Sequence, residues 1–95
     1  MSFTLKVQDE AEEDIDSAFT WYEEQSVGLG SKFLEEIEEG FLLITNNPEH
    51  YGYYKPRPHY RRFLLKQFPL RIVYEIEENN IVVFRVLHVK RSKGF

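Results

Sequence analysis

The feature that most constrains the fold is the segment 68–91, which has the pattern of one long β-hairpin. Apolar residues occupy every second position of its first arm: Leu70, Ile72, Tyr74 and Ile76. This spacing is typical of a strand with one buried face. An asparagine pair at positions 79 and 80 follows, and asparagine tolerates the left-handed backbone of a tight turn. The segment therefore predicts two paired strands, and its arginines and histidine make it the expected functional region.

The predicted turn fixes the register of the two strands. With the two asparagines as the loop, Glu78 pairs with Ile81, and Arg71 comes opposite His88. Directly paired residues point to the same face of a sheet, and the apolar even-numbered face of the first arm is expected to take the helices. Arg71 and His88 are therefore predicted to share the open face.

The first half of the chain predicts a short strand and two helices. Residues 3–7 alternate as a strand, and an amphipathic helix follows from Ala11, with Asp9 as its expected cap. A second helix carries an apolar stripe from Phe33 to Ile44 and ends before the sequence Asn-Asn-Pro. These helices are expected to form an antiparallel hairpin.

The middle of the chain completes the predicted order of elements. Residues 49–59 have the composition of an ordered loop with a short extended piece at 53–55, and residues 60–66 resume as a strand. The predicted fold class is α+β, in the order β-α-α-β-β-β, with a small antiparallel sheet and an N-terminal helical hairpin packed on one face.

Composition indicates one small intracellular domain. The 95 residues are 42% hydrophobic, which is enough for one core and predicts a single domain over 1–95. Cysteine is absent, so disulfides and thiolate metal sites are excluded and a reducing cytoplasm is the expected location. No stretch approaches the roughly 20 apolar residues that a bilayer span requires, and no export signal is recognisable.

Charge divides the chain into two unlike halves. Residues 1–50 hold two lysines and 13 acidic residues, whereas residues 51–95 hold ten basic and three acidic residues. One interpretation is that acidic helices dock on a basic sheet. The other is that a basic face meets a polyanion or an acidic partner. The two interpretations are compatible.

Several chemistries are not expected. The three histidines lack the spacing of a metal-binding face, so no metal site is predicted, and no cofactor fingerprint or phosphate loop is present. The acidic cluster of the second helix alternates with an apolar stripe, which favours a solvated helix face over paired catalytic carboxylates.

Basic and aromatic residues gather on the predicted strands: Tyr60, Arg61, Arg62, Lys66, Arg71, Arg85, His88, Lys90 and Arg91. In a metal-independent ribonuclease, His88 would serve as acid or base, with Arg62 and Arg71 holding phosphate. The alternative is that most of these cations keep the sheet edge soluble and pair with helix acids. For Arg85, which the register places opposite Tyr74, an ion pair with a helix acid is favoured over ligand contact.

Aromatic clusters have two interpretations as well. Trp21 and Tyr22 near the end of the first helix, and the tyrosines at 51, 53 and 54, have the chemistry to stack on bases. Core and loop packing is favoured, because aromatic side chains commonly close the end of a helical hairpin.

The order of local phrases resembles the RelE/ParE superfamily of type II toxin–antitoxin toxins along nearly the whole chain. The phrases are Ala11-x-x-Asp14-Ile15 with Ala18, Trp21-Tyr22-Glu23, Gly28-Leu-Gly30 before Phe33, Ile44 to Pro48, Arg62 before Phe68-Pro69, Ile72-Val-Tyr74 and Arg85-Val-Leu-His88-x-x-Arg91. The resemblance implies the same fold class and a small cognate antitoxin that wraps the toxin.

The superfamily has two branches that imply different targets. RelE-like toxins cut mRNA in the ribosome with basic residues and a histidine or tyrosine, which would make Arg62, Arg71 and His88 catalytic here. ParE-like toxins act on DNA gyrase. Carried over by position, the binding residues are Arg62, Arg71, Arg85, His88 and Arg91.

The departures from the mRNA-cleaving branch favour a ParE-like toxin. The sequence pI is about 5.4, whereas a ribosome-entering toxin is usually strongly basic. No tyrosine follows His88 in the chain. The expected partners are therefore the antitoxin and DNA gyrase, with no membrane partner. The alternatives are a ribosome-dependent mRNA endonuclease and an inactive member that only binds an antitoxin or a second copy of itself as a homodimer.

Overall fold

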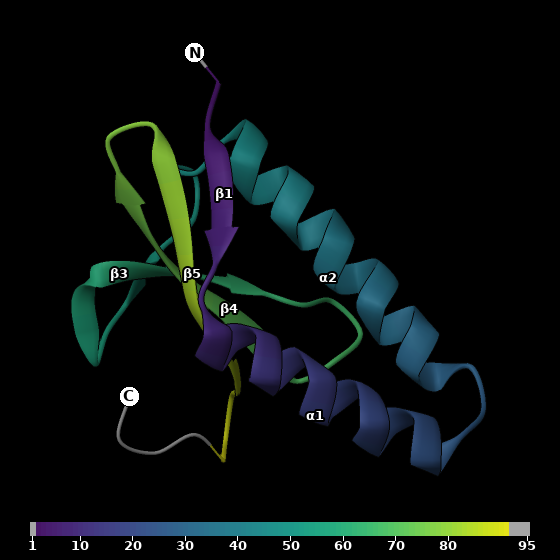
Figure 1. Cartoon of the computed structure of the whole chain (residues 1–95). Helices are drawn as coiled ribbons and strands as arrows, with labels where there is room; N and C mark the ends of the chain where they lie inside the picture. The colour runs from purple at the N-terminus through teal and green to yellow at the C-terminus, as the bar shows by residue number, and fades with distance from the viewer. Residues whose placement is uncertain (1, 92–95) are drawn as a thin grey trace.

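The computed structural model describes residues 2–91 (Figure 1). Its elements are β1 (Thr4–Val7), α1 (Asp9–Gln25), α2 (Leu29–Asn46), β2 (Tyr53–Tyr54), β3 (Arg57–Leu64), β4 (Leu70–Glu77) and β5 (Asn80–His88). The five strands form one sheet in the order β1-β5-β4-β3-β2. The strands β5 to β2 pair antiparallel, and β1 pairs parallel with β5, so the sheet is mixed.

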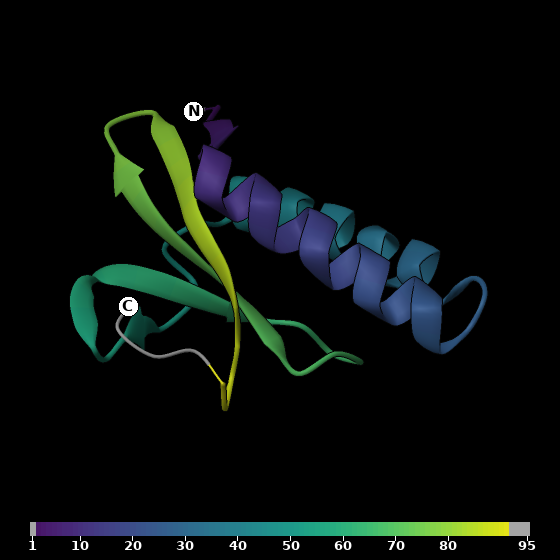
Figure 2. The ribbon, with the colours of Figure 1, turned by 60° about the horizontal axis from the view of Figure 1, so that its bottom comes forward.

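The α+β class with an N-terminal helical hairpin is confirmed. The extended piece expected at 53–55 is the two-residue strand β2, which adds a strand to the predicted order. The next strand, β3, begins at Arg57 instead of residue 60. Figure 2 shows both helices on one side of the sheet.

The two helices are joined at a tightly closed turn. The carboxylate of Glu23 accepts hydrogen bonds from the backbone N–H groups of Gly28 (3.0 Å) and Gly30 (2.9 Å), which satisfies donors at the start of α2. Gly28 has φ of 92°, a left-handed conformation that suits glycine. The start of α1 differs from the prediction, because its cap is Gln8, without a side-chain hydrogen bond, and Asp9 is the first helical residue.

The main core lies between the helices and the sheet. It joins Phe33, Ile37 and Ile44 of α2 to Ile72 and Tyr74 of β4 and to Ile81 and Val83 of β5. Gly40 allows α2 to approach the sheet closely, since a Cβ there would lie 3.0 Å from atoms of both Ile72 and Phe63. The prediction that the even-numbered face of β4 takes the helices is therefore confirmed.

The predicted register of the hairpin is wrong. Glu77 pairs with Asn80, so the turn residues are Glu78, at φ 57°, and Asn79. Tyr74 pairs with Val83, whereas its neighbour Val73 pairs with Arg85, so one extra residue bulges from β5.

The physical reason for this register is the core. The predicted pairing would have set Arg85 against the buried Tyr74, whereas the observed pairing sets Val83 there. The bulge then returns Val86 to the same apolar cluster. As a consequence His88 pairs with Leu70 and Arg71 with Leu87, which places Arg71 and His88 on opposite faces.

A small apolar patch covers part of the face away from the helices. Tyr54, Val73 and Leu87 form a buried cluster there, with Tyr60 packed against it. The rings of Tyr60 and Phe84 stack with centroids 4.8 Å apart.

Candidate functional site

The basic residues and His88 line two hollows on opposite sides of the sheet. The first, which we call the basic groove, has a volume of about 430 Å³ and is lined by Lys55, Pro56, Arg62, Leu64, Arg71 and Val89. The second, the helix-side pocket, has a volume of about 480 Å³ and is lined by Ser17, Ala18, Trp21, Tyr22, Pro69, Leu70, His88 and Arg91.

The basic groove brings two predicted phosphate-binding arginines together. Arg62 of β3 pairs with Val73, and Arg71 of β4 pairs with Leu64, so the two arginines share the face away from the helices. The Arg71 guanidinium donates to the Val89 carbonyl (3.1 Å) and lies 5.2 Å from the ring centre of Tyr54. Within residues 2–91 its Nε is buried without a hydrogen-bond partner. Forked cationic donors on adjacent strands suit an anion such as phosphate.

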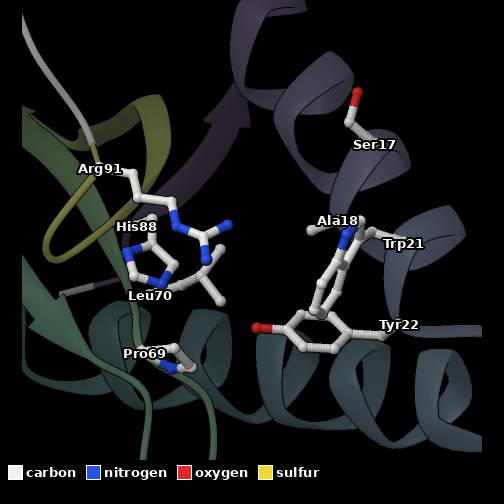
Figure 3. Close-up of a pocket in the computed structure, with 8 residues that line it drawn as sticks. All are labelled: Ser17, Ala18, Trp21, Tyr22, Pro69, Leu70, His88 and Arg91. Atoms are coloured by element: carbon white, nitrogen blue, oxygen red, sulfur yellow. The ribbon is translucent and has the colours of Figure 1, made fainter. Parts of the chain in front are cut away.

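The helix-side pocket brings the C-terminal end of β5 against α1. In Figure 3 the Arg91 guanidinium points from one wall toward Trp21 and Tyr22 on the other. His88 Nδ1 accepts the backbone N–H of Lys90 (3.1 Å), so the neutral imidazole carries its proton on Nε2.

Burial and the charge of Arg91 both act on the titratable groups of this pocket. Partial burial lowers the pKa of His88 below its ordinary value of 6.5, and the positive charges of Arg91 and Lys90 lower it further. Burial raises the pKa of Tyr22, an effect that the charge of Arg91 partly opposes. Near neutral pH, His88 is therefore mainly uncharged and Arg91 supplies the fixed charge among the lining residues.

Two other arginines have structural contacts. The Arg85 guanidinium donates to Asp14 through Nε (2.7 Å) and Nη2 (3.1 Å), which confirms the predicted ion pair with a helix acid. The pKa of Arg85 is raised by this hydrogen bond. Arg61 holds the loop before β3, because it donates to the carbonyl of Tyr51 (2.7 Å) and to the hydroxyl of Tyr53 (3.0 Å).

The structure thus distributes the candidate residues instead of gathering them. Arg62 and Arg71 share the basic groove, His88 and Arg91 share the helix-side pocket, and Arg85 is bound to α1. Sequence reasoning missed Lys55 in the groove and the use of Pro69 and Leu70 as pocket lining. The phrases around Trp21 and Pro69 were recognisable in the sequence, but their meeting depends on how α1 crosses the strand ends.

The aromatic clusters serve mainly in packing, as favoured from the sequence. Tyr22 packs against Phe33 and Phe68, with ring centroids 5.6 and 4.8 Å away, and Tyr51 packs against Phe63 at 4.9 Å. Trp21 differs, because 49% of it is exposed.

Among residues 2–91, no group of three or more His, Asp or Glu side chains is arranged to hold a metal ion. No helix in the same part of the chain has the length and apolar character needed to cross a bilayer.

Comparison with solved structures shows close similarity to toxin–antitoxin proteins. A chain from the chromosomal ParDE toxin–antitoxin system of P. aeruginosa superposes with a TM-score of 0.84 at 19% identity, covering 94% of this chain and 98% of the other. A chain from the toxin–antitoxin complex RelBE2 of Mycobacterium tuberculosis superposes with a TM-score of 0.65 at 14% identity, covering 93% and 99%. At these identities the likeness shows the fold alone.

Sequence comparison identifies the family. Curated protein sequences give no match. A family described as "ParE toxin of type II toxin-antitoxin system, parDE" matches residues 5–92, which is nearly the whole chain. The chain therefore belongs to the ParE toxin family of type II toxin–antitoxin systems.

Proposed function

We propose that this ParE-family chain is a single toxin domain that inhibits growth in the cytoplasm by binding DNA gyrase, and that a small antitoxin encoded beside it neutralises it. The observation that carries the choice of binding over cleavage is the separation of His88 from Arg62 and Arg71 by the sheet. A metal-independent ribonuclease needs an acid or base within reach of the phosphate that its arginines hold.

The side chains that line the basic groove lack such a group. Its lining consists of Lys55, Arg62, Arg71, Pro56, Leu64 and Val89, without a histidine or a carboxylate. The groove therefore has the chemistry to hold an anion, and His88 is not among the residues that could serve there as acid or base. This composition supports inhibition by occupancy of a partner.

The test is induced expression in bacteria, with and without the neighbouring small gene, while incorporation of labelled precursors into DNA and protein is followed. Gyrase inhibition predicts an early stop in DNA synthesis, filamentous cells and rescue by the small gene. A folded, soluble chain that causes no growth defect would contradict a toxin mechanism and leave an inactive antitoxin-binding member.

A second candidate function is ribosome-dependent mRNA cleavage, which the pairing of Arg62 and Arg71 in one groove favours. An immediate stop in translation would support it. In that case His88 is the expected acid or base, and His88→Ala abolishes cleavage on ribosomes.

A further inference from the structure

Trp21 is a large aromatic side chain held at the surface. It is the only tryptophan of the chain, and 49% of it is exposed. Its ring meets that of Tyr22 edge to face, with centroids 5.1 Å apart, and Tyr22 is itself packed on Phe68 of the core. Trp21 therefore packs on Tyr22, which is anchored in the core, while part of the Trp21 ring remains accessible. This combination is common in residues that dominate protein interfaces.

The two sides of Trp21 carry opposite charge. On one side lies the helix-side pocket, with Arg91 on its far wall (Figure 3). On the other side lies a second hollow of about 420 Å³, which we call the acidic hollow; it is lined by Asp16, Ser17, Thr20, Trp21 and Glu24. Among the described residues, neither Asp16 nor Glu24 is paired with a cation.

Much of the lining of the helix-side pocket is apolar. In Figure 3, Ala18 lies beside Trp21 on α1, and Pro69 and Leu70 lie on the strand side near His88. An apolar side chain inserted there removes water from these surfaces and from the tryptophan ring. The surface thus presents the cationic Arg91 wall, the apolar pocket with Trp21, and the acidic hollow in a fixed order that runs from the strand ends across α1.

We propose that this surface binds a segment of the antitoxin in one orientation, with a carboxylate at Arg91, an apolar side chain in the pocket beside Trp21, and a lysine or arginine at Asp16 and Glu24. The inference rests on the proposed neutralisation by an antitoxin. The reversed orientation would bring like charges together at both ends, which disfavours it.

A second copy of this chain fits the surface less well. In a two-fold contact through this face, the large exposed apolar side chain that the second copy presents is its own Trp21, and one tryptophan side chain does not fill both the helix-side pocket and the acidic hollow. An antitoxin segment can supply separate side chains for the pocket and for the acidic hollow.

The pocket electrostatics agree with an anionic group at the Arg91 wall. The charge of Arg91 acts on both His88 and Tyr22, which are on different walls, so its field extends across the pocket. His88 is mainly neutral near pH 7, and the attraction for a carboxylate therefore depends on the arginine.

The experiment uses the full chain and the product of the neighbouring small gene. The toxin is labelled with ¹⁵N and the antitoxin is not, so the indole N–H of Trp21 gives the single tryptophan signal of the sample. The proposal predicts that this signal shifts on complex formation. It also predicts that Trp21→Ala, Arg91→Glu and Asp16→Lys each weaken affinity by about tenfold or more.

Matched variants separate this surface from general charge effects. Lys6→Glu and Glu12→Lys make charge changes of the same size at exposed positions that line neither hollow, and they should change affinity by less than about threefold. Far-ultraviolet circular dichroism confirms that each variant is folded.

The outcomes distinguish a failure of neutralisation from a failure of binding at this surface. If the wild-type toxin does not bind the antitoxin, neutralisation itself fails. If it binds, but the Trp21 signal is unmoved and the three variants keep their affinity, this surface is not the binding site. A Trp21 signal that shifts with toxin concentration alone, together with a dimer mass, would assign the surface to a second copy and overturn the inference.

Discussion

At the scale of single residues, Asp14 connects the first helix to the bulge in β5. Its carboxylate accepts two hydrogen bonds from Arg85 and a third from the backbone N–H of Val86 at 3.0 Å. Val86 lies opposite Ile72 of β4 and beyond the end of the β1 pairing, which stops at Val83, and its backbone N–H is satisfied by Asp14. We expect Asp14→Asn to lower the free energy of unfolding by about 1–3 kcal/mol, measured by urea denaturation, because charge-assisted bonds in a partly buried place are weakened.

The control for this change is Asp16→Asn on the same helix. Asp16 is exposed and has no ion pair or hydrogen bond among the described residues, so its effect should stay within about 0.5 kcal/mol. Equal effects of the two variants would show that helix charge, and not the contact with β5, determines the stability.

His88 provides a prediction on pH. Because burial and the charges of Arg91 and Lys90 lower its pKa, an NMR titration should place its midpoint below 6.5, and Arg91→Gln should raise the midpoint. The unfolded chain then binds this proton more strongly than the folded chain, so protonation of this group lowers the free energy of unfolding as the pH falls below about 6.5. Lys6→Gln removes a charge far along the sheet and should leave the midpoint in place. An unchanged midpoint in Arg91→Gln would show that the arginine does not face His88 in solution.

At the scale of elements, the turn between β4 and β5 contains a local conflict. Glu78 adopts φ of 57°, a region that residues with a Cβ disfavour, while Asn79 lies outside the left-handed region. We expect Glu78→Gly to raise the free energy of unfolding by about 0.5–1 kcal/mol, because glycine adopts this conformation without strain. Asn79→Gly is the matched control and should be neutral or destabilising. A loss of stability in Glu78→Gly would mean that the glutamate makes a compensating contact.

The same turn explains how far the sequence predicts this fold. Alternation along β4 and the apolar stripes of the helices were sufficient to predict the fold class and the buried face of β4, because local periodicity alone determines these two features. The turn position was wrong because the asparagine preference at 79 and 80 is weaker than the gain from burying Val83 and Val86. The burial of Val86 depends on a bulge in β5, and no local sequence pattern here predicts that bulge. The same bulge shifts the pairing so that His88 faces α1.

The candidate site was predicted in part for the same reason. Arg62 and Arg71 meet because both lie on regular strands, and Arg85 finds a helix acid as expected. The pocket beside Trp21 required knowledge of which strand ends α1 crosses, and that is a tertiary arrangement.

At the scale of the whole molecule, the two halves of the charge distribution become the helices and the sheet. Docking of acidic helices on basic strands explains part of the asymmetry, through the Arg85–Asp14 pair and the exposed Lys66–Glu39 pair at 3.9 Å. Lys55, Arg62 and Arg71 lie on the face away from the helices, where the helix acids do not reach them. This face therefore carries a local positive field on a chain whose net charge is −4.

This local field predicts that the chain binds a polyanion at the basic groove. The affinity should depend on where the positive charges lie and not on the net charge of the chain. We expect the double variant Lys55→Gln/Arg62→Gln to weaken binding of a labelled single-stranded oligonucleotide, measured by fluorescence anisotropy at several salt concentrations. Each phosphate contact removed should lower the slope of log affinity against log salt by about 0.7, or about 1.4 for the pair. The double variant Lys6→Gln/Lys32→Gln makes the same change in net charge in the acidic half of the chain and should leave the slope unaltered. Equal slopes in the two variants would show that net charge alone governs the interaction, and the basic groove would then have no role as an anion site.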